Sequence, residues 1–458
     1  MLNSDIEISN IRRYDIDWLR IILFGLLIPF HVAVGLVWNT YGNTFNADGG
    51  SVNNNPGVVT SSLFLLWMHQ WRLPALFMIS GMGTAFAFRR RTVETFIKER
   101  ANRLLIPLLF GMLVVNMIFW WLVVYDNLPN DTQDSRDLFN NNPVLWGLIV
   151  WAIIAFISII AFPDVNLHLW FLVNLFVYSL ILAPLFGRVN KSSTGFLVRF
   201  TKRIIGFGNG FGFLFILPIP LILIELILKP NFIGYTGHGY EFWWYLIFFL
   251  IGYGSIIAKD EYYQVIRRLK YIATGLAIIF SVIFLKFYES LGEKGDYYVN
   301  GGWANKEEFF HNADTILISV IHSLHAWFWC VAIFSWGAQL LNRPSSNLTY
   351  LNQAVYPFYI VHMSFVFLGL FIIRDLGIPD FLIFIIVTIF TFLGCWGVFE
   401  LVKRKKWTRS FFGIKESSTI CSSCNFSVRE NNKFCTSCGS VVQKTINNDS
   451  FTRISKLN

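Results

Sequence analysis

Long apolar runs constrain this chain more than any other feature. Charged residues make up only 14% of its 458 residues, and eleven runs are long and apolar enough to be membrane segments. An α-helix needs roughly 20 apolar residues to cross a bilayer core, and the runs lack the alternation of β-barrel strands. The sequence therefore predicts an all-α integral membrane protein in a lipid bilayer. The runs lie near 18–38, 61–88, 104–125, 144–162, 168–186, 213–228, 241–258, 271–286, 317–341, 356–373 and 381–402.

Lys and Arg in the loops predict the topology. Cytoplasmic loops of membrane proteins collect these residues, which explains the net charge of +9 without a nucleic-acid partner. Three runs separate the basic loops 89–103 and 187–212, so both loops face the cytoplasm only if one run does not cross. The weakest is 144–162, which we expect to re-enter or to lie on the outer surface. About ten transmembrane helices then remain in the plasma membrane, with both termini in the cytoplasm. An eleventh crossing with an external C-terminus is the alternative.

Two ionisable residues lie on one face of the first run. Arg20 and His31 are eleven residues apart, which is about 20° past three helical turns and about 16 Å along the axis. Asp17 can pair with Arg20, and Pro29 removes a backbone hydrogen bond and predicts a kink before His31. Ionisable residues inside a membrane are costly and face the protein interior or a wet cavity. For His31 alone, a buried neutral ring with satisfied hydrogen bonds is the simpler interpretation.

Five short motifs follow one another between residues 12 and 402. They are Asp17-Trp-Leu-Arg20 with His31, Leu73-Pro-Ala-Leu-Phe-Met-Ile-Ser-Gly81, Arg100-Ala-Asn-Arg103, His168-Leu-Trp-Phe-Leu172 and Tyr356-Pro-Phe-Tyr-Ile-Val-His362. In this order they resemble the membrane acyltransferase-3 family, which includes peptidoglycan, lipopolysaccharide and exopolysaccharide O-acyltransferases and the succinyltransferase of periplasmic glucans. Several O-acetyltransferases of the family have Glu where this chain has Leu175. The fourth motif is therefore more similar to the glucan-modifying branch.

The resemblance implies transfer of an acyl group, acetyl or succinyl, from cytoplasmic acyl-CoA to a hydroxyl of an extracytoplasmic glycan or related cell-surface acceptor. A hydroxyl must lose its proton to attack, and an imidazole suits that task. We expect His31 to be the general base and Arg20 to belong to the catalytic residues; a covalent acyl-histidine is the second option. Arg100 and Arg103 would bind the CoA phosphates through charge-assisted hydrogen bonds, although topology signalling also explains them.

Five further residues are expected to bind the substrates. Arg72 could hold the acceptor or the developing oxyanion, with snorkelling to the interface as the alternative. His168 and Trp170 begin a run and could stack on a sugar, although interfacial tryptophan belts also explain Trp170. Tyr359 and His362 match family positions for which we assign no separate role.

The C-terminal part carries two C-x2-C pairs separated by ten residues. Four thiolates at this spacing predict a tetrahedral, structural Zn2+ site whose binding energy would fold the segment. Its ligands would be Cys421, Cys424, Cys435 and Cys438. Two disulfides are the alternative, which a reducing cytoplasm disfavours. We expect a membrane acyltransferase domain over 1–410, a cytoplasmic zinc ribbon over 418–441 and a disordered tail over 442–458.

Two other functions fit parts of the pattern. A secondary transporter would use intramembrane His and Arg for proton or anion coupling. A non-catalytic membrane scaffold would recruit a protein partner through the zinc ribbon. The ordered motifs favour the acyltransferase, and release of thiol from acyl-CoA by the purified protein would separate it from both alternatives.

Overall fold

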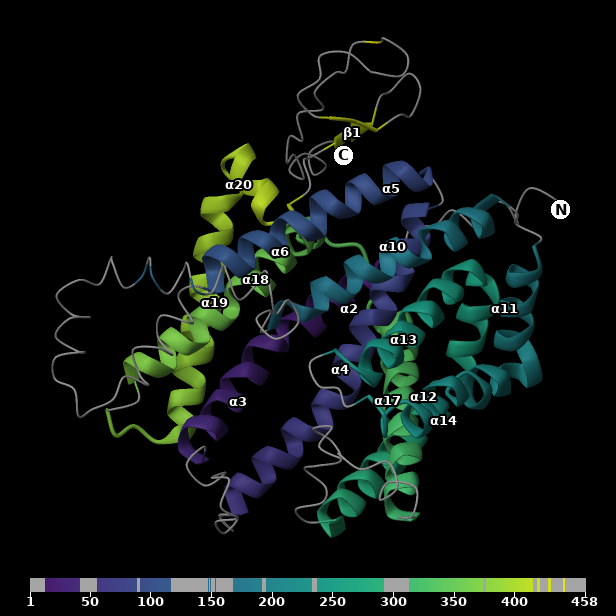
Figure 1. Cartoon of the computed structure of the whole chain (residues 1–458), viewed down its shortest axis with the longest axis horizontal. Helices are drawn as coiled ribbons and strands as arrows, with labels where there is room; N and C mark the ends of the chain where they lie inside the picture. Colours follow the sequence, from purple (N-terminus) through teal and green to yellow (C-terminus); the bar gives the residue numbers. More distant parts are fainter. Residues whose placement is uncertain are drawn as a thin grey trace, which may run out of the picture.

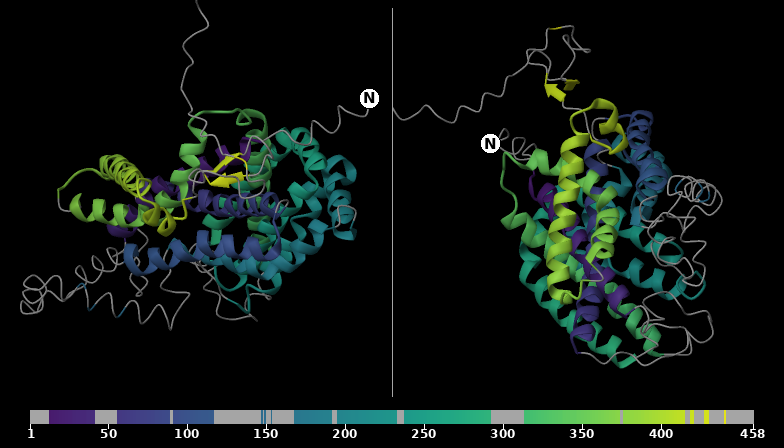
Figure 2. Two further views of the ribbon diagram at one scale, coloured as in Figure 1. Left: turned by 90° about the horizontal axis from the view of Figure 1, so that it is seen from above. Right: turned by 90° about the vertical axis from the view of Figure 1, so that its left-hand side faces the viewer.

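The computed structural model of the chain is a bundle of helices with one small β-hairpin (Figure 1). Figure 2 shows that α5, α20 and the hairpin lie at the same end of the bundle. The structure describes residues 13–41, 56–88, 91–116, 147, 149, 153, 168–191, 195–232, 237–291, 313–373, 376–414, 418–420, 427–429 and 440.

The helices follow the apolar runs closely. Those of the first part are α2 (Asp15–Gly25), α3 (Leu27–Tyr41), α4 (Pro56–Phe88), α5 (Val93–Arg100), the π-helical turn η1 (Ala101–Leu105), α6 (Ile106–Phe110), the π-helical turn η2 (Gly111–Val115) and α10 (Trp170–Lys191). Those of the second part are α11 (Phe196–Gly206), the 3-10 turn η4 (Phe207–Gly210), the π-helical turn η5 (Gly212–Ile216), α12 (Ile219–Ile227), α13 (Tyr240–Ile257), α14 (Lys259–Leu291), α17 (Ala313–Leu340), α18 (Leu348–Ile373), α19 (Asp380–Val402) and α20 (Lys406–Phe411).

Seven helical stretches within the described ranges are long and apolar enough to cross a membrane, with α2 and α3 counted as one. With its 33 residues, α4 is long enough too, but His69, Gln70 and Arg72 interrupt its apolar run. A helical multi-pass membrane protein is thereby confirmed. The run 144–162 lies outside the described residues except for 147, 149 and 153, so the number of crossings stays a prediction.

The run 213–228, which we expected to cross as one helix, belongs to a bent pair instead. Phe196–Gly210 and Gly212–Ile227 meet at 109°. The bend follows Gly208 and Asn209, whose left-handed φ angles of 57° and 58° end the preceding helix. The segment is therefore a broken span or a re-entrant loop, and α12 packs against α13 and α17.

Two glycines let α4 and α13 cross at close range. A Cβ atom at Gly81 would collide with the carbonyl of Phe249, and one at Gly252 with the carbonyl of Met78. Only glycine permits backbones to approach this closely. This contact fixes α4, and with it the Leu73–Gly81 motif, in the middle of the bundle.

The hairpin beyond the bundle pairs β1 (Ser418–Ile420) with β2 (Ser427–Arg429) in antiparallel register. The four cysteines of the expected Zn2+ site, Cys421, Cys424, Cys435 and Cys438, lie outside the described residues. In the part of the chain that the structure describes, no group of side chains could hold a metal ion. The zinc ribbon therefore stays a prediction.

Candidate active site

A cavity of about 730 Å³ opens among α2, α4, α5, α10 and α18. It brings together Arg20, Arg100 and Arg103, which the sequence places in two separate motifs. The complete charged lining consists of Asp17, Arg20, Arg91, Glu99, Arg100 and Arg103.

Two of the four arginines in the cavity have carboxylate partners. Arg20 Nη1 lies 3.4 Å from Asp17 Oδ1, as the sequence spacing predicted, and Arg91 Nε lies 2.8 Å from Glu99 Oε1. Within the described ranges, Arg100 and Arg103 pair with no carboxylate, because the two acids of the lining are already matched. The cavity therefore carries an excess of positive charge.

Local structure explains where these two arginines lie. The Thr92 side chain caps α5 by accepting a hydrogen bond from Thr95 N, and the helix then continues into η1. Pro107 cannot donate a hydrogen bond to the carbonyl of Arg103, and the backbone there adopts the wider π-helical turn. Such turns often occur at functional sites.

Arg100 is fixed by its surroundings. Its Nη2 donates to Thr84 Oγ1 at 3.0 Å, and its guanidinium lies over the Phe96 ring, 4.9 Å from the centroid. Burial, reinforced by the neighbouring arginines, lowers the pKa of Arg100 to about 10. The side chain therefore stays protonated at neutral pH and offers a positive charge to the cavity.

His31 lies beyond the break between α2 and α3. The predicted effect of Pro29 is present, but the helix is interrupted one turn earlier, at Leu26. Pro29 has no N–H to bond to the carbonyl of Gly25, four residues before it. The His31 ring remains partly exposed, and its Nδ1 lies 2.9 Å from the carbonyl of Leu27.

His31, His168 and His362 form a cluster that the sequence alone could not assemble. The ring centroid of His362 lies 5.0 Å from that of His31 and 4.9 Å from that of His168. His168 Nε2 donates to the carbonyl of Ile360 at 3.2 Å. The Tyr359 hydroxyl donates to the carbonyl of His168, so the turn just before α10 is joined to α18 at this point.

The hydrogen bonds define the protonated nitrogens of this cluster. A carbonyl oxygen can only accept, so His362 Nδ1 donates to the carbonyl of Tyr359 at 2.7 Å and its Nε2 carries a lone pair. His31 Nδ1 then donates to Leu27 and, at 3.3 Å, toward His362 Nε2. In the neutral ring His31 Nε2 is consequently unprotonated, and no residue of the described chain bonds to it.

An aromatic layer of Phe24, Phe171 and Tyr359 lies between the cavity and the histidines. Phe24 and Phe171 line the cavity, and the Phe24 ring contacts Tyr359 with 5.6 Å between centroids. Tyr359 in turn contacts His168 at 5.7 Å. The cavity therefore ends at aromatic rings, and His31 follows seven residues after Phe24 in the chain, about two helical turns.

Arg72 is a fully buried cation near this cluster. Its guanidinium lies 3.8 Å from the centroid of Phe30, the neighbour of His31, and the His69 ring stacks on Phe30 as well. Arg72 Nε and Nη1 have no hydrogen-bond partner among the described residues. Trp170, by contrast, is buried in the core, where it packs against Tyr245.

The chain is similar to known proteins. A family model described as an acyltransferase domain matches residues 13–400. The chain belongs to the acyltransferase-3 family. Glucans biosynthesis protein C of Escherichia coli O81 (strain ED1a) is 22% identical to the acyltransferase over 362 residues, which cover 77% of this chain and 81% of the relative. The protein of the same name from Shigella dysenteriae serotype 1 (strain Sd197) is also 22% identical, over 364 residues. No solved structure matches the chain.

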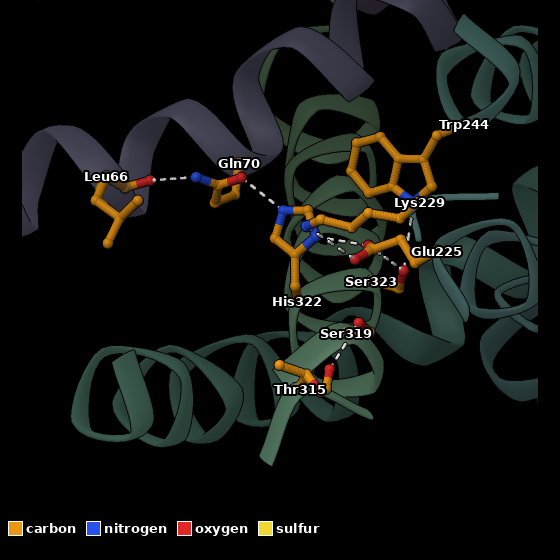
Figure 3. A network of polar contacts seen from close by, with 9 residues as sticks. All are labelled: Leu66, Gln70, Glu225, Lys229, Trp244, Thr315, Ser319, His322 and Ser323. Atoms are coloured by element: carbon orange, nitrogen blue, oxygen red, sulfur yellow. Dashed lines mark hydrogen bonds and ion pairs between the residues drawn. The ribbon is translucent and has the colours of Figure 1, made fainter. Parts of the chain in front are cut away.

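The acyltransferase also holds a second polar cluster, which we call the Glu225 network (Figure 3). Glu225 Oε1 lies 2.6 Å from His322 Nδ1 and accepts a hydrogen bond from Ser323 Oγ at 2.7 Å. Lys229 Nζ lies 4.0 Å from Glu225 Oε2. His322 Nε2 lies 2.5 Å from Gln70 Oε1, so the network joins α4, α12 and α17.

The partners of His322 favour a doubly protonated ring. Gln70 Nε2 donates to the carbonyl of Leu66 at 3.2 Å, which leaves the amide oxygen of Gln70 facing His322 Nε2. An ionised Glu225 likewise requires a proton on Nδ1. The geometry therefore fits a buried imidazolium paired with a carboxylate.

The Glu225 network was not predicted from the sequence. Glu225 is the sole acid in the run 213–228, four residues before Lys229, and a charge in such a run is a signal in itself. Nothing in the sequence links it to His322, which lies on a helix 97 residues later in the chain.

Proposed function

We propose that the acyltransferase moves an acetyl or succinyl group from cytoplasmic acyl-CoA to a hydroxyl of an extracytoplasmic glycan or related cell-surface acceptor. Its place would be the plasma membrane, with both termini in the cytoplasm. The observation that carries the proposal is the order of features along the bundle. A cavity contains two arginines without a carboxylate partner among the described residues, an aromatic layer follows, and then comes a histidine with an unprotonated Nε2. The relatives are named for glucan biosynthesis, which supports a glycan acceptor.

The cavity suits the nucleotide end of CoA. Phosphates bind arginine through charge-assisted, bidentate hydrogen bonds, and Arg100 and Arg103 have no carboxylate to satisfy them within the described residues. Arg20, which also lines the cavity, adds a third cation beside Asp17. The pantetheine arm would then extend past Phe24 toward His31.

His31 is suited to general base catalysis. Its Nε2 would take the proton of the acceptor hydroxyl while the oxygen forms a bond to the thioester carbonyl carbon. The C–S bond then breaks, and the departing thiolate of CoA receives the proton from His31. During the reaction the charged ring keeps its Nδ1–H directed at Leu27 and His362, which stabilises the imidazolium.

Other residues would position the second substrate and the developing charge. Arg72, two of whose guanidinium nitrogens have no hydrogen-bond partner in the described chain, would bind the acceptor or the oxyanion of the tetrahedral intermediate. His168, Tyr359 and His362 would hold the acceptor side of the site. Trp170, which is buried in the core, would support the position of these three residues by packing.

The experiment is thiol release from acetyl-CoA and from succinyl-CoA by full-length protein in proteoliposomes. We expect His31→Ala to abolish turnover while CoA still binds, because the change leaves the arginines in place. Retained turnover by correctly inserted His31→Ala would contradict the proposal. An acylated His31 peptide, found by mass spectrometry without acceptor, would replace general base catalysis with the covalent route.

We further propose that Cys421, Cys424, Cys435 and Cys438 bind one structural Zn2+. Four thiolates satisfy its coordination and leave no open position, so the ion would take no part in acyl transfer. A folded ribbon at the cytoplasmic end would offer a surface for a protein partner.

A further inference from the structure

We propose that residues 412–414, which we call the strap, form a wall of the donor cavity and determine how tightly the acyltransferase binds the CoA part of its donor. The strap lies beyond the acyltransferase domain, whose match ends at residue 400. The inference rests on the proposed function, because it takes acyl-CoA to be the occupant of the cavity.

The backbone after α19 is folded into a fixed turn. Arg409 Nε donates to the carbonyl of Lys403 at 2.6 Å, and Ile414 N donates to the carbonyl of Arg409 at 3.0 Å. These bonds turn α20 back toward the bundle, so that the chain leaves the last helix and returns to α6. Figure 1 shows α20 at the end of the molecule where α5 lies.

Aromatic packing holds the strap against α6. The Phe110 ring stacks on Phe411 with 5.1 Å between centroids and contacts Phe412 at 5.2 Å. Phe412 and Ile414 are 6% and 8% exposed. Side chains buried to this degree are packed as core residues, so the strap is an integral part of the bundle.

Gly413 allows the strap to lie close to Arg103. Its φ is +61°, and a Cβ at this position would lie 2.9 Å from the carbonyl oxygen of Arg103 and 3.2 Å from Pro107 Cγ. Both the dihedral angle and the contact require glycine. The backbone of the strap thus lies directly against the turn that carries Arg103.

The strap also forms part of the cavity surface. Gly413 and Ile414 line the cavity together with Arg100 and Arg103, the two cations that lack a carboxylate partner in the described chain. A phosphate bound by these arginines would therefore occupy a cavity that Ile414 also lines. A charge placed at residue 414 should change phosphate binding according to its sign.

The test compares Ile414→Glu with Ile414→Lys in full-length protein in nanodiscs, with CoA as the probe in calorimetry. Both variants replace the same apolar side chain by a charged one, so a purely structural effect moves the Kd of both in the same direction. We expect the Kd of the Glu variant to exceed that of the Lys variant by about tenfold or more, with the ratio falling at high salt. Equal Kd values would overturn the inference.

Gly413→Ala tests the same wall without adding charge. We expect a rise of at least about threefold in the Kd for CoA, because the substituted strap must move away from Arg103. Gly377→Ala is the matched control, since Gly377 has a similar φ of +62° but no atom of the described residues within 4 Å of its Cβ position. An unchanged Kd in folded Gly413→Ala would also contradict the inference. A wild-type protein that binds no CoA refutes the proposed function itself, whereas CoA binding that ignores residues 413 and 414 refutes only the role of the strap.

Discussion

Replacing Arg100 by glutamine should weaken CoA binding strongly and leave the fold almost unchanged. Thr84, the partner of Arg100, donates its own hydrogen bond to the carbonyl of Ser80 at 2.9 Å, so the substitution leaves no buried hydroxyl without a partner. The substitution therefore removes only the charged hydrogen-bond donor that we expect to bind a CoA phosphate. A hydrogen bond to a charged group contributes about 1.5–3 kcal/mol, and about 1.4 kcal/mol corresponds to tenfold in affinity. The Kd for CoA should therefore rise by about 10- to 150-fold.

Calorimetry of full-length Arg100→Gln in nanodiscs measures this change. Lys98→Gln is the control, because Lys98 lies on the same helix, pairs with Glu94 at 2.7 Å and is largely exposed outside the cavity. Its Kd for CoA should stay within about twofold of wild type, since exposed ion pairs contribute little. A normal Kd in Arg100→Gln, or an equal loss in Lys98→Gln, would refute the assignment of the cavity to the CoA phosphates.

Three further predictions concern the rest of the chain. Glu225→Ala should lower the free energy of unfolding by about 3–5 kcal/mol, because it leaves a buried imidazolium without its carboxylate. The control Glu289→Ala breaks an exposed pair with Lys286 and should change the free energy of unfolding by less than about 1 kcal/mol. Similar melting shifts in the two variants would contradict this prediction. Burial lowers the pKa of Lys229 to about 8 from 10.5. Between these pH values the unfolded chain binds more protons than the folded one, so the free energy of unfolding should increase as the pH rises. Lys229→Met should remove part of that increase, and the same pH dependence of stability in the variant would count against a buried charged lysine. Elemental analysis of purified protein should find about one zinc per chain and none after Cys421→Ser with Cys438→Ser, whereas equal zinc in both proteins would exclude the cysteine site.

The sequence predicted the helical membrane bundle because each long run must form its own backbone hydrogen bonds in lipid. It also predicted the Arg20–Asp17 pair and a break caused by Pro29, since both depend on neighbours within one helix. The bend near Gly208 was not predicted, because left-handed backbone angles at Gly208 and Asn209 have no periodic signal.

Long-range contacts account for the other features of the structure that the sequence did not predict. The motifs assigned Arg20 to the catalytic residues and Arg100 to donor binding, but only the fold places both in one cavity and Thr84 beside Arg100. The meeting of His31 with His362, and that of Glu225 with His322, depends on how helices pack, and single-sequence patterns do not contain that information. The roles of all these residues stay predictions until the variants are measured.

The three rings of Phe24, Phe171 and Tyr359 have a consequence for unproductive hydrolysis of the acyl donor. Under the proposed function, a thioester that rests in the arginine-lined cavity would lie on the cytoplasmic side of these rings, separated from His31. The pantetheine arm would have to pass Phe24 to reach His31, and the arm itself would then occupy the passage through which water could follow. Protection of the activated acyl group against hydrolysis would thus come from the donor itself. An enzyme with a small side chain at residue 24 should hydrolyse acyl-CoA and release CoA without acylating an acceptor.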